Sequence, residues 1–99
     1  MLNINKEKKG TACTYFLEGR LDTTTAPQLE GDIKESIEGV ESLVMDLSKL
    51  EYISSAGLRV LLGAAQAMDG KGDMVVRNLN QSVREVFELT GFSNLFNIE

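Results

Sequence analysis

Residues 43–62 of the chain read LVMDLSKLEYISSAGLRVLL, and this stretch decides the fold class. The apolar run Leu43–Leu47 predicts a strand, and the mixed residues Ser48–Tyr52 predict a loop. From Ser55 onward the apolar residues recur at helical spacing, which predicts a helix over Ser55–Met68. A strand followed by a loop and a helix is the repeating unit of an α/β domain.

Two serines, Ser54 and Ser55, stand where this helix should begin. A hydroxyl in this place can cap the free backbone N–H groups of the first helical turn. It can also carry a phosphate, because the same N–H groups and the helix dipole favour an anion. The residues alone leave both roles open for both serines.

Further strands are predicted on either side of this stretch, at Leu2–Asn5, Ala12–Leu17 and Met74–Val76. The basic cluster Lys6–Lys9 is typical of a solvated turn between two strands. Glycines indicate other turns, and these lie at Gly10, Gly19-Arg20-Leu21 and Gly70-Lys71-Gly72.

Two more helices are predicted by capping residues and helical spacing. The first opens at Thr23–Pro27, with a threonine as its N-cap, and stops at Gly39. The last is capped by Asn80 or Ser82 and stops at Gly91. The apolar tail that follows, Phe92–Ile98, predicts a final short strand. The order of elements gives an initial hairpin and two parallel crossovers, and therefore a mixed sheet backed by helices.

The helix over Ser55–Met68 has an unusually apolar surface. Residues placed 100° apart give a core face of Leu58, Leu61, Leu62, Ala65 and Met68. The opposite side collects Ala56, Val60, Gly63, Ala64 and Ala67, where a surface helix normally carries charge. Either the helix is buried on two sides or it is a docking surface. Burial on two sides would need a further covering element, and the remaining sequence is short, which favours docking.

The composition excludes several classes of protein. Ninety-nine residues form one domain, and a net charge of −5 argues against binding to nucleic acid or anionic lipid. Without histidine the chain has no Ser-His-Asp or Cys-His nucleophile system and no His-containing metal site. No stretch is long and apolar enough to cross a membrane, and the lone Cys13 fits a buried thiol in a reducing cytoplasm. We therefore expect a cytoplasmic protein that is not an enzyme and binds no cofactor or metal.

Four segments resemble, in order and spacing, the STAS domain of bacterial anti-sigma-factor antagonists. They are Gly19-Arg20-Leu21-Asp22, Leu43–Ser48, Tyr52–Leu58 and Ser82–Phe92. The resemblance covers nearly the whole chain. It implies one STAS domain over residues 1–99, with α/β architecture and a mixed four- to five-stranded sheet against which the helices pack.

The resemblance also implies partner switching. In this family a serine kinase that acts as an anti-sigma factor binds the unphosphorylated antagonist and frees the sigma factor. Phosphorylation ends that binding, and a PP2C-type phosphatase restores it. By its position before Gly57 and Leu58, the phosphoacceptor falls on Ser55. Many phosphorylated members have aspartate immediately before the acceptor, and Ser54 in that place is the second candidate.

The surface expected to bind the partner combines the loop before the first helix with the start of the second. Its predicted members are Asp22, Thr23, Thr24, Ser54, Ala56, Gly57, Leu58, Arg59 and Val60. Asp46 either supports this loop electrostatically or has a structural role at the end of its strand.

An alternative function is a non-phosphorylated STAS subunit that assembles constitutively, in a stress-sensing complex or a lipid-transport ATPase. Ser55 would then serve only as a helix cap, and Ser55→Ala would cost about 0.5–2 kcal/mol of stability. A small enzyme is the third alternative, and it has the least support because no acid–base histidine or metal cluster exists.

Overall fold

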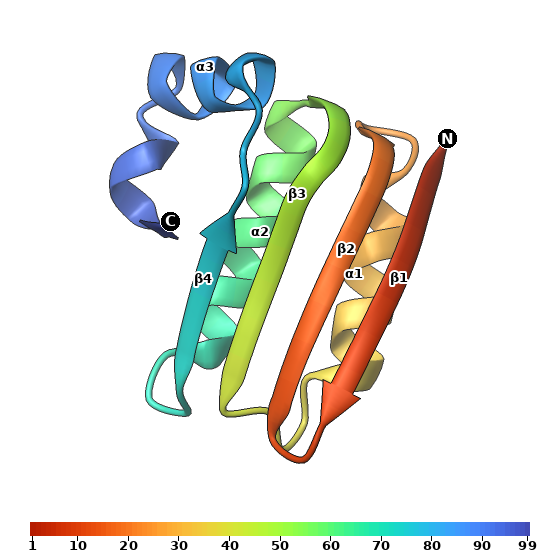
Figure 1. Ribbon diagram of the computed structural model, residues 1–99, viewed down its shortest axis with the longest axis vertical. Helices are drawn as coiled ribbons and strands as arrows, with labels where there is room; N and C mark the ends of the chain where they lie inside the picture. The colour runs from red at the N-terminus through yellow and green to blue at the C-terminus, as the bar shows by residue number, and fades with distance from the viewer.

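Five strands form one mixed sheet in the order β1-β2-β3-β4-β5 in the computed structural model, which describes residues 1–99 (Figure 1). Their bounds are β1 Leu2–Lys9, β2 Ala12–Leu21, β3 Ser42–Ile53, β4 Asp73–Arg77 and β5 Asn97–Ile98. The hairpin β1–β2 is antiparallel, and the pairs β2–β3, β3–β4 and β4–β5 are parallel. The predicted mixed sheet and its initial hairpin are confirmed, and the chain makes three parallel crossovers where two were predicted, because the short β5 adds one after α3.

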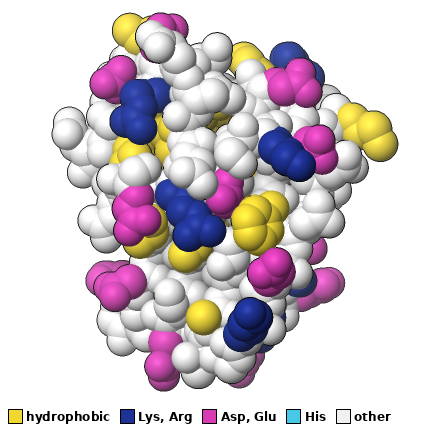
Figure 2. All heavy atoms as spheres, in the orientation of Figure 1, with side chains coloured by type: hydrophobic (Ala, Val, Ile, Leu, Met, Phe, Trp, Pro, Cys, Tyr) yellow, Lys and Arg dark blue, Asp and Glu magenta, His cyan; other side chains and the backbone are white.

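Two long helices cover one face of this sheet. They are α1 (Ala26–Ser36) and α2 (Ser55–Met68), and both lie behind the strands in Figure 1. The shorter α3 (Gln81–Leu89) and a 3-10 turn, η1 (Phe92–Leu95), follow β4 at the side of the sheet. The other face of the sheet carries no helix. In Figure 2 that open face shows charged side chains of both signs among scattered apolar ones.

The core lies between the sheet and the two helices. Alternate residues of β3, Leu43, Met45 and Leu47, point toward the helices and are fully buried. Leu58 and Leu61 of α2 meet them from the other side and are also fully buried. Cys13 is buried in β2, as expected for a structural thiol.

Two predicted loops are strands instead. Ser48–Tyr52 belongs to β3, and Lys6–Lys9 forms the second half of β1. The first error arises because the pairing of β3 with β2 shifts register between Phe16 and Glu18 and again after Gly19, which breaks the apolar alternation. The second arises because β1 is an edge strand, where exposed lysines are tolerated and discourage pairing with another chain.

Gly19 was predicted in a turn but lies inside β2. Its φ of 102° is disfavoured for other residues, and a Cβ there would collide with the carbonyl oxygen of Met1. The glycine therefore marks a close approach of two backbones. The predicted turns at Gly10 and at Gly70–Gly72 are confirmed.

The helix ends follow the predictions with small differences. Helix α1 stops at Ser36, with Ile37 as C-cap, before the predicted Gly39. Asn80, and not Ser82, caps α3: its Oδ1 accepts from the Val83 N–H at 3.0 Å. The tail contains the predicted short strand as β5, preceded by η1. None of the helices combines the length and the apolar character needed to span a bilayer.

Candidate functional site

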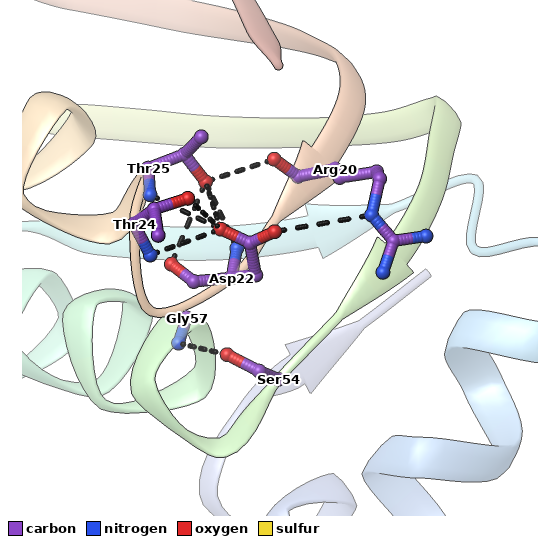
Figure 3. Close-up of polar contacts among 6 residues, drawn as sticks. All are labelled: Arg20, Asp22, Thr24, Thr25, Ser54 and Gly57. Atoms are coloured by element: carbon purple, nitrogen blue, oxygen red, sulfur yellow. Dashed lines mark hydrogen bonds and ion pairs between the residues drawn. The ribbon is translucent and has the colours of Figure 1, made fainter.

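The carboxyl ends of β2 and β3 bring two loops together. Leu21 and Ile53, the last residues of the two strands, are register partners, and each strand leads through a loop into a helix. The Ser54 N–H donates to the Leu21 carbonyl oxygen at 2.9 Å and joins the loops directly. The residues after β2 and those at the start of α2 therefore lie side by side (Figure 3).

The two serines have different roles in the structure. Ser54 is the N-cap of α2: its Oγ accepts from the Gly57 N–H at 3.3 Å, and its carbonyl oxygen accepts from the Leu58 N–H at 2.9 Å. Ser55 is the first residue of the helix, is exposed, and its hydroxyl makes no hydrogen bond within the chain. The cap is therefore Ser54 alone, and the expectation that Ser55 could be the cap is wrong.

Gly57 fixes the start of α2 against the sheet. A Cβ at this position would lie 2.7 Å from Cγ of Leu21, 2.9 Å from the Leu21 carbonyl oxygen and 3.0 Å from Cγ1 of Ile53. Leu58, the next residue, has no exposed surface. Both residues were predicted to bind a partner, but their burial leaves neither available for direct contact. They hold the helix in place.

The loop after β2 is organised by the Asp22 carboxylate. Its Oδ1 accepts from the Thr24 hydroxyl at 2.7 Å and from the N–H groups of Thr24 and Thr25 at 3.0 and 3.1 Å. In return, Oγ1 of Thr25 accepts from the Asp22 N–H at 2.9 Å, which gives the reciprocal pattern of a capping box (Figure 3). The hydrogen bond from the Thr24 hydroxyl and those from the backbone lower the pKa of Asp22.

Thr25 stands at the N-cap position of α1, but its side chain accepts from no N–H of that helix. Its hydroxyl instead donates to the Arg20 carbonyl oxygen at 2.9 Å. The predicted threonine cap is thus right in position and wrong in bonding, because Pro27 has no N–H to donate and the Gln28 N–H donates to the Thr25 carbonyl oxygen at 3.0 Å. Thr23 and Thr24 remain exposed beside the start of α2.

The outer side of α2 is covered in part by α1. Ala64 was predicted to face outward but is buried at 3% exposure, because α1 packs beside α2 on the same face of the sheet. Of the predicted core face, Leu62 and Ala65 are only half-buried. Between the two helices a shallow groove of about 150 Å³ remains, lined by Glu30, Ile33, Lys34, Ile37, Val60, Gly63, Ala64 and Ala67.

Most of the predicted site residues therefore share one end of the molecule. The exposed members are Thr23, Thr24, Ser55 and Arg59, with Asp22, Ser54, Ala56 and Val60 half-buried around them. Two neighbours were missed, Arg20 and Tyr52, which are register partners in β2 and β3. Each of them directly precedes a buried residue, Leu21 or Ile53, so strand alternation places both side chains on the open face of the sheet. The alternation could not be recognised from sequence because Ser48–Tyr52 was expected to be a loop.

Asp46 is a structural residue inside β3, beside Arg77 at the end of β4, and not at the end of its own strand as predicted. Its carboxylate accepts from the Ser48 N–H at 3.0 Å, from Nδ2 of Asn78 at 3.0 Å and from Nε of Arg77 at 3.3 Å. Burial raises the pKa of Asp46, but these hydrogen bonds outweigh burial and the pKa lies below its ordinary value. None of its partners belongs to the Ser54 loop. No group of three or more potential metal ligands exists in the chain.

Comparison with known proteins identifies the family of the chain. The STAS domain family matches residues 3–99. BtrV of Bordetella bronchiseptica is 44% identical over 82 residues, which cover 81% of this chain and 71% of BtrV. The anti-sigma-B factor antagonist of Listeria monocytogenes is 29% identical over 97 residues, covering 95% of this chain and 84% of that protein.

Solved structures share the fold. An anti-sigma factor antagonist from Mycobacterium paratuberculosis superimposes with a TM-score of 0.89 at 25% identity, over 99% of this chain and 85% of that one. The phosphorylated form of the Bacillus protein SpoIIAA superimposes with a TM-score of 0.76 at 20% identity, over 98% of this chain and 91% of that one. The chain therefore belongs to the STAS domain family, among the anti-sigma factor antagonists.

Proposed function

We propose that this protein, when unphosphorylated, binds an anti-sigma-factor serine kinase in the cytoplasm and so frees a sigma factor. Phosphorylation of Ser55 by that kinase ends the binding, and a PP2C-type phosphatase restores it. The observation that carries this proposal is the contrast between the serines. Ser55 presents an unbonded, exposed hydroxyl, whereas the Ser54 hydroxyl is engaged as a helix cap.

The start of α2 can accept a phosphate without refolding. The cap uses the Gly57 N–H, and the N–H groups at the first two helical positions, Ser55 and Ala56, have no partner within the helix. A phosphate on Ser55 adds about −1.5 to −2 charges close to these donors and to the positive end of the helix dipole. SpoIIAA, which has the same fold, is known in a phosphorylated form.

The same phosphate opposes binding of a partner at this surface. Thr23, Thr24 and Arg59 are exposed, as Ser55 is, and a partner that covers these residues together with Ser55 would have to remove water from the dianion. That desolvation is costly unless the partner supplies matching cations. Binding can therefore be lost while the domain itself stays unchanged.

The test uses the chain, the anti-sigma-factor serine kinases of its source organism and ATP. We expect intact mass and peptide mapping to show one phosphate, at Ser55, and a complex that forms with ADP to dissociate as phosphate accumulates. Ser55→Ala should bind without being modified, and Ser55→Glu should bind at least tenfold more weakly. Ser54→Ala is the matched control and should still be phosphorylated.

Modification of Ser54 instead of Ser55 would contradict the assignment. Full binding by Ser55→Glu would contradict the switch, and it would favour the constitutive assembly subunit over the phosphorylated antagonist.

A further inference from the structure

Arg20 and Tyr52 form a stacked pair at the border of the candidate site. They are cross-strand register partners in β2 and β3, and the Arg20 guanidinium lies 4.4 Å from the centre of the Tyr52 ring. Because Leu21 and Ile53 are buried on the helix side, this pair projects from the open face of the sheet. Tyr52 is 39% exposed, which is unusual for a large side chain in this protein.

The pair holds the guanidinium in one orientation. Besides the ring, Nε of Arg20 lies 3.8 Å from Oδ2 of Asp22, in an ion pair that leaves half of the arginine side chain exposed. The two terminal nitrogens point away from Asp22 and have no hydrogen-bond partner in the chain (Figure 3). A guanidinium held by stacking loses less side-chain entropy when it binds a further group.

The free edge of this guanidinium has a specific chemical preference. Two parallel N–H donors in a planar fork match the two oxygens of a carboxylate, and such bidentate pairs are stronger than hydrogen bonds between neutral groups. Tyrosine and arginine are also the residues most enriched among those that dominate binding at protein interfaces. The pair therefore fits an Asp or Glu side chain of a protein partner.

The location connects the pair to the proposed interface. Arg20 lies two residues before Asp22, and Tyr52 lies two residues before Ser54, while the Ser54 N–H and the Leu21 carbonyl oxygen join the two segments at 2.9 Å. A partner that covers the loop after β2 and the start of α2 also reaches Arg20, because all three lie at the carboxyl ends of β2 and β3. We infer that Arg20, oriented by Tyr52, binds a carboxylate of the anti-sigma-factor kinase. The inference rests on the proposed function.

The test measures the dissociation constant of the unphosphorylated chain and its kinase. Arg20→Gln should weaken binding about tenfold or more, since it removes one member of a charged pair. Arg20→Lys keeps the charge without the planar fork and should give an intermediate loss. Tyr52→Ala should weaken binding severalfold, and Tyr52→Phe should bind like the unchanged chain because the ring face is kept.

Lys71→Gln is the matched control for net charge. Lys71 lies in the turn between α2 and β4, at the opposite end of the strands, and its loss should leave binding unchanged. Binding of the unchanged chain should also weaken more steeply than that of Arg20→Gln between about 50 and about 300 mM salt, because the added ion pair is screened.

Two failures can be told apart. If the unchanged chain binds the kinase and Arg20→Gln and Tyr52→Ala bind equally well, the inference is overturned and the proposed function stands. If the unchanged chain binds no such kinase, the proposed function fails and the inference fails with it. Circular dichroism of each variant establishes that it is folded before its affinity is compared.

Discussion

At the level of single residues, the two serines before α2 have neighbouring positions and separate tasks. The Ser54 hydroxyl satisfies a backbone donor that the helix itself leaves free, and the Ser55 hydroxyl satisfies none. Ser54→Ala should therefore lower the free energy of unfolding by about 0.5–2 kcal/mol. Ser55→Ala should change it by less than about 0.5 kcal/mol, as is usual for an exposed site without contacts. Urea unfolding of the two variants beside the unchanged chain measures both values, and equal losses would contradict the division of roles.

The sequence could indicate that a serine caps this helix but could not decide which one. Both residues suit the position, and local spacing allows either start. The choice is made by a contact distant in sequence, the hydrogen bond from the Ser54 N–H to the Leu21 carbonyl oxygen, which fixes where β3 ends. The resemblance to known switch loops, in contrast, pointed to Ser55 from the residues that follow it.

At the level of elements, α2 contains two glycines with opposite surroundings. A Cβ at Gly57 would meet Leu21 at 2.7 and 2.9 Å, whereas a Cβ at Gly63 would meet nothing within 4 Å. Gly57→Ala should destabilise the fold by about 1–3 kcal/mol, since backbone of β2 must move. Gly63→Ala should stabilise it by about 0.5–1 kcal/mol through helix propensity. Thermal unfolding of the two variants and of the unchanged chain measures both effects, and each variant serves as the control for the other. A shift of the melting temperature in the same direction for both variants would refute the packing argument.

The errors made from sequence also belong to this level. The full length of β3 was missed because its register with β2 shifts twice, so the alternation of apolar residues fails over Ser48–Tyr52. Ala64 was placed on the outer side of α2 because helical spacing cannot reveal that α1 packs there. Whether a segment forms a helix or a strand could mostly be predicted from its local pattern. Which side of a helix is covered could not, because it depends on neighbours that are distant in sequence.

At the level of the whole molecule, the mixed sheet and the order of elements along the chain could be predicted because part of each strand and helix has a recognisable local pattern and parallel strands require crossovers. The polar links between elements could not. Asp46 in β3 accepts from Arg77, the last residue of β4, and from Asn78, which follows it. Asp32 in α1 accepts from the Tyr15 hydroxyl at 2.7 Å and from Nζ of Lys6 at 3.0 Å. These contacts join segments that the sequence keeps apart.

These carboxylates make the stability of the whole domain depend on pH. Burial raises the pKa of Asp46 and of Asp32, but hydrogen bonds and cations outweigh it, and both pKa values lie below normal. In the unfolded chain these carboxyl groups have pKa values of about 3.9, so the unfolded chain takes up protons at a higher pH than the folded chain does. Their contribution to stability is therefore fully present above the unfolded pKa and is lost as the pH falls through the lowered folded pKa.

Asp46→Asn tests this dependence. At neutral pH it should lower the free energy of unfolding by about 1–3 kcal/mol, because hydrogen bonds to a charged, nearly buried acceptor are weakened. The difference between variant and unchanged chain should shrink as the pH falls below about 4, where protonation removes the same charge from the unchanged chain. Urea unfolding at a series of pH values from about 7 to about 2 gives this difference directly. A difference that stays constant across the series would show that Asp46 acts through shape and not through its charge.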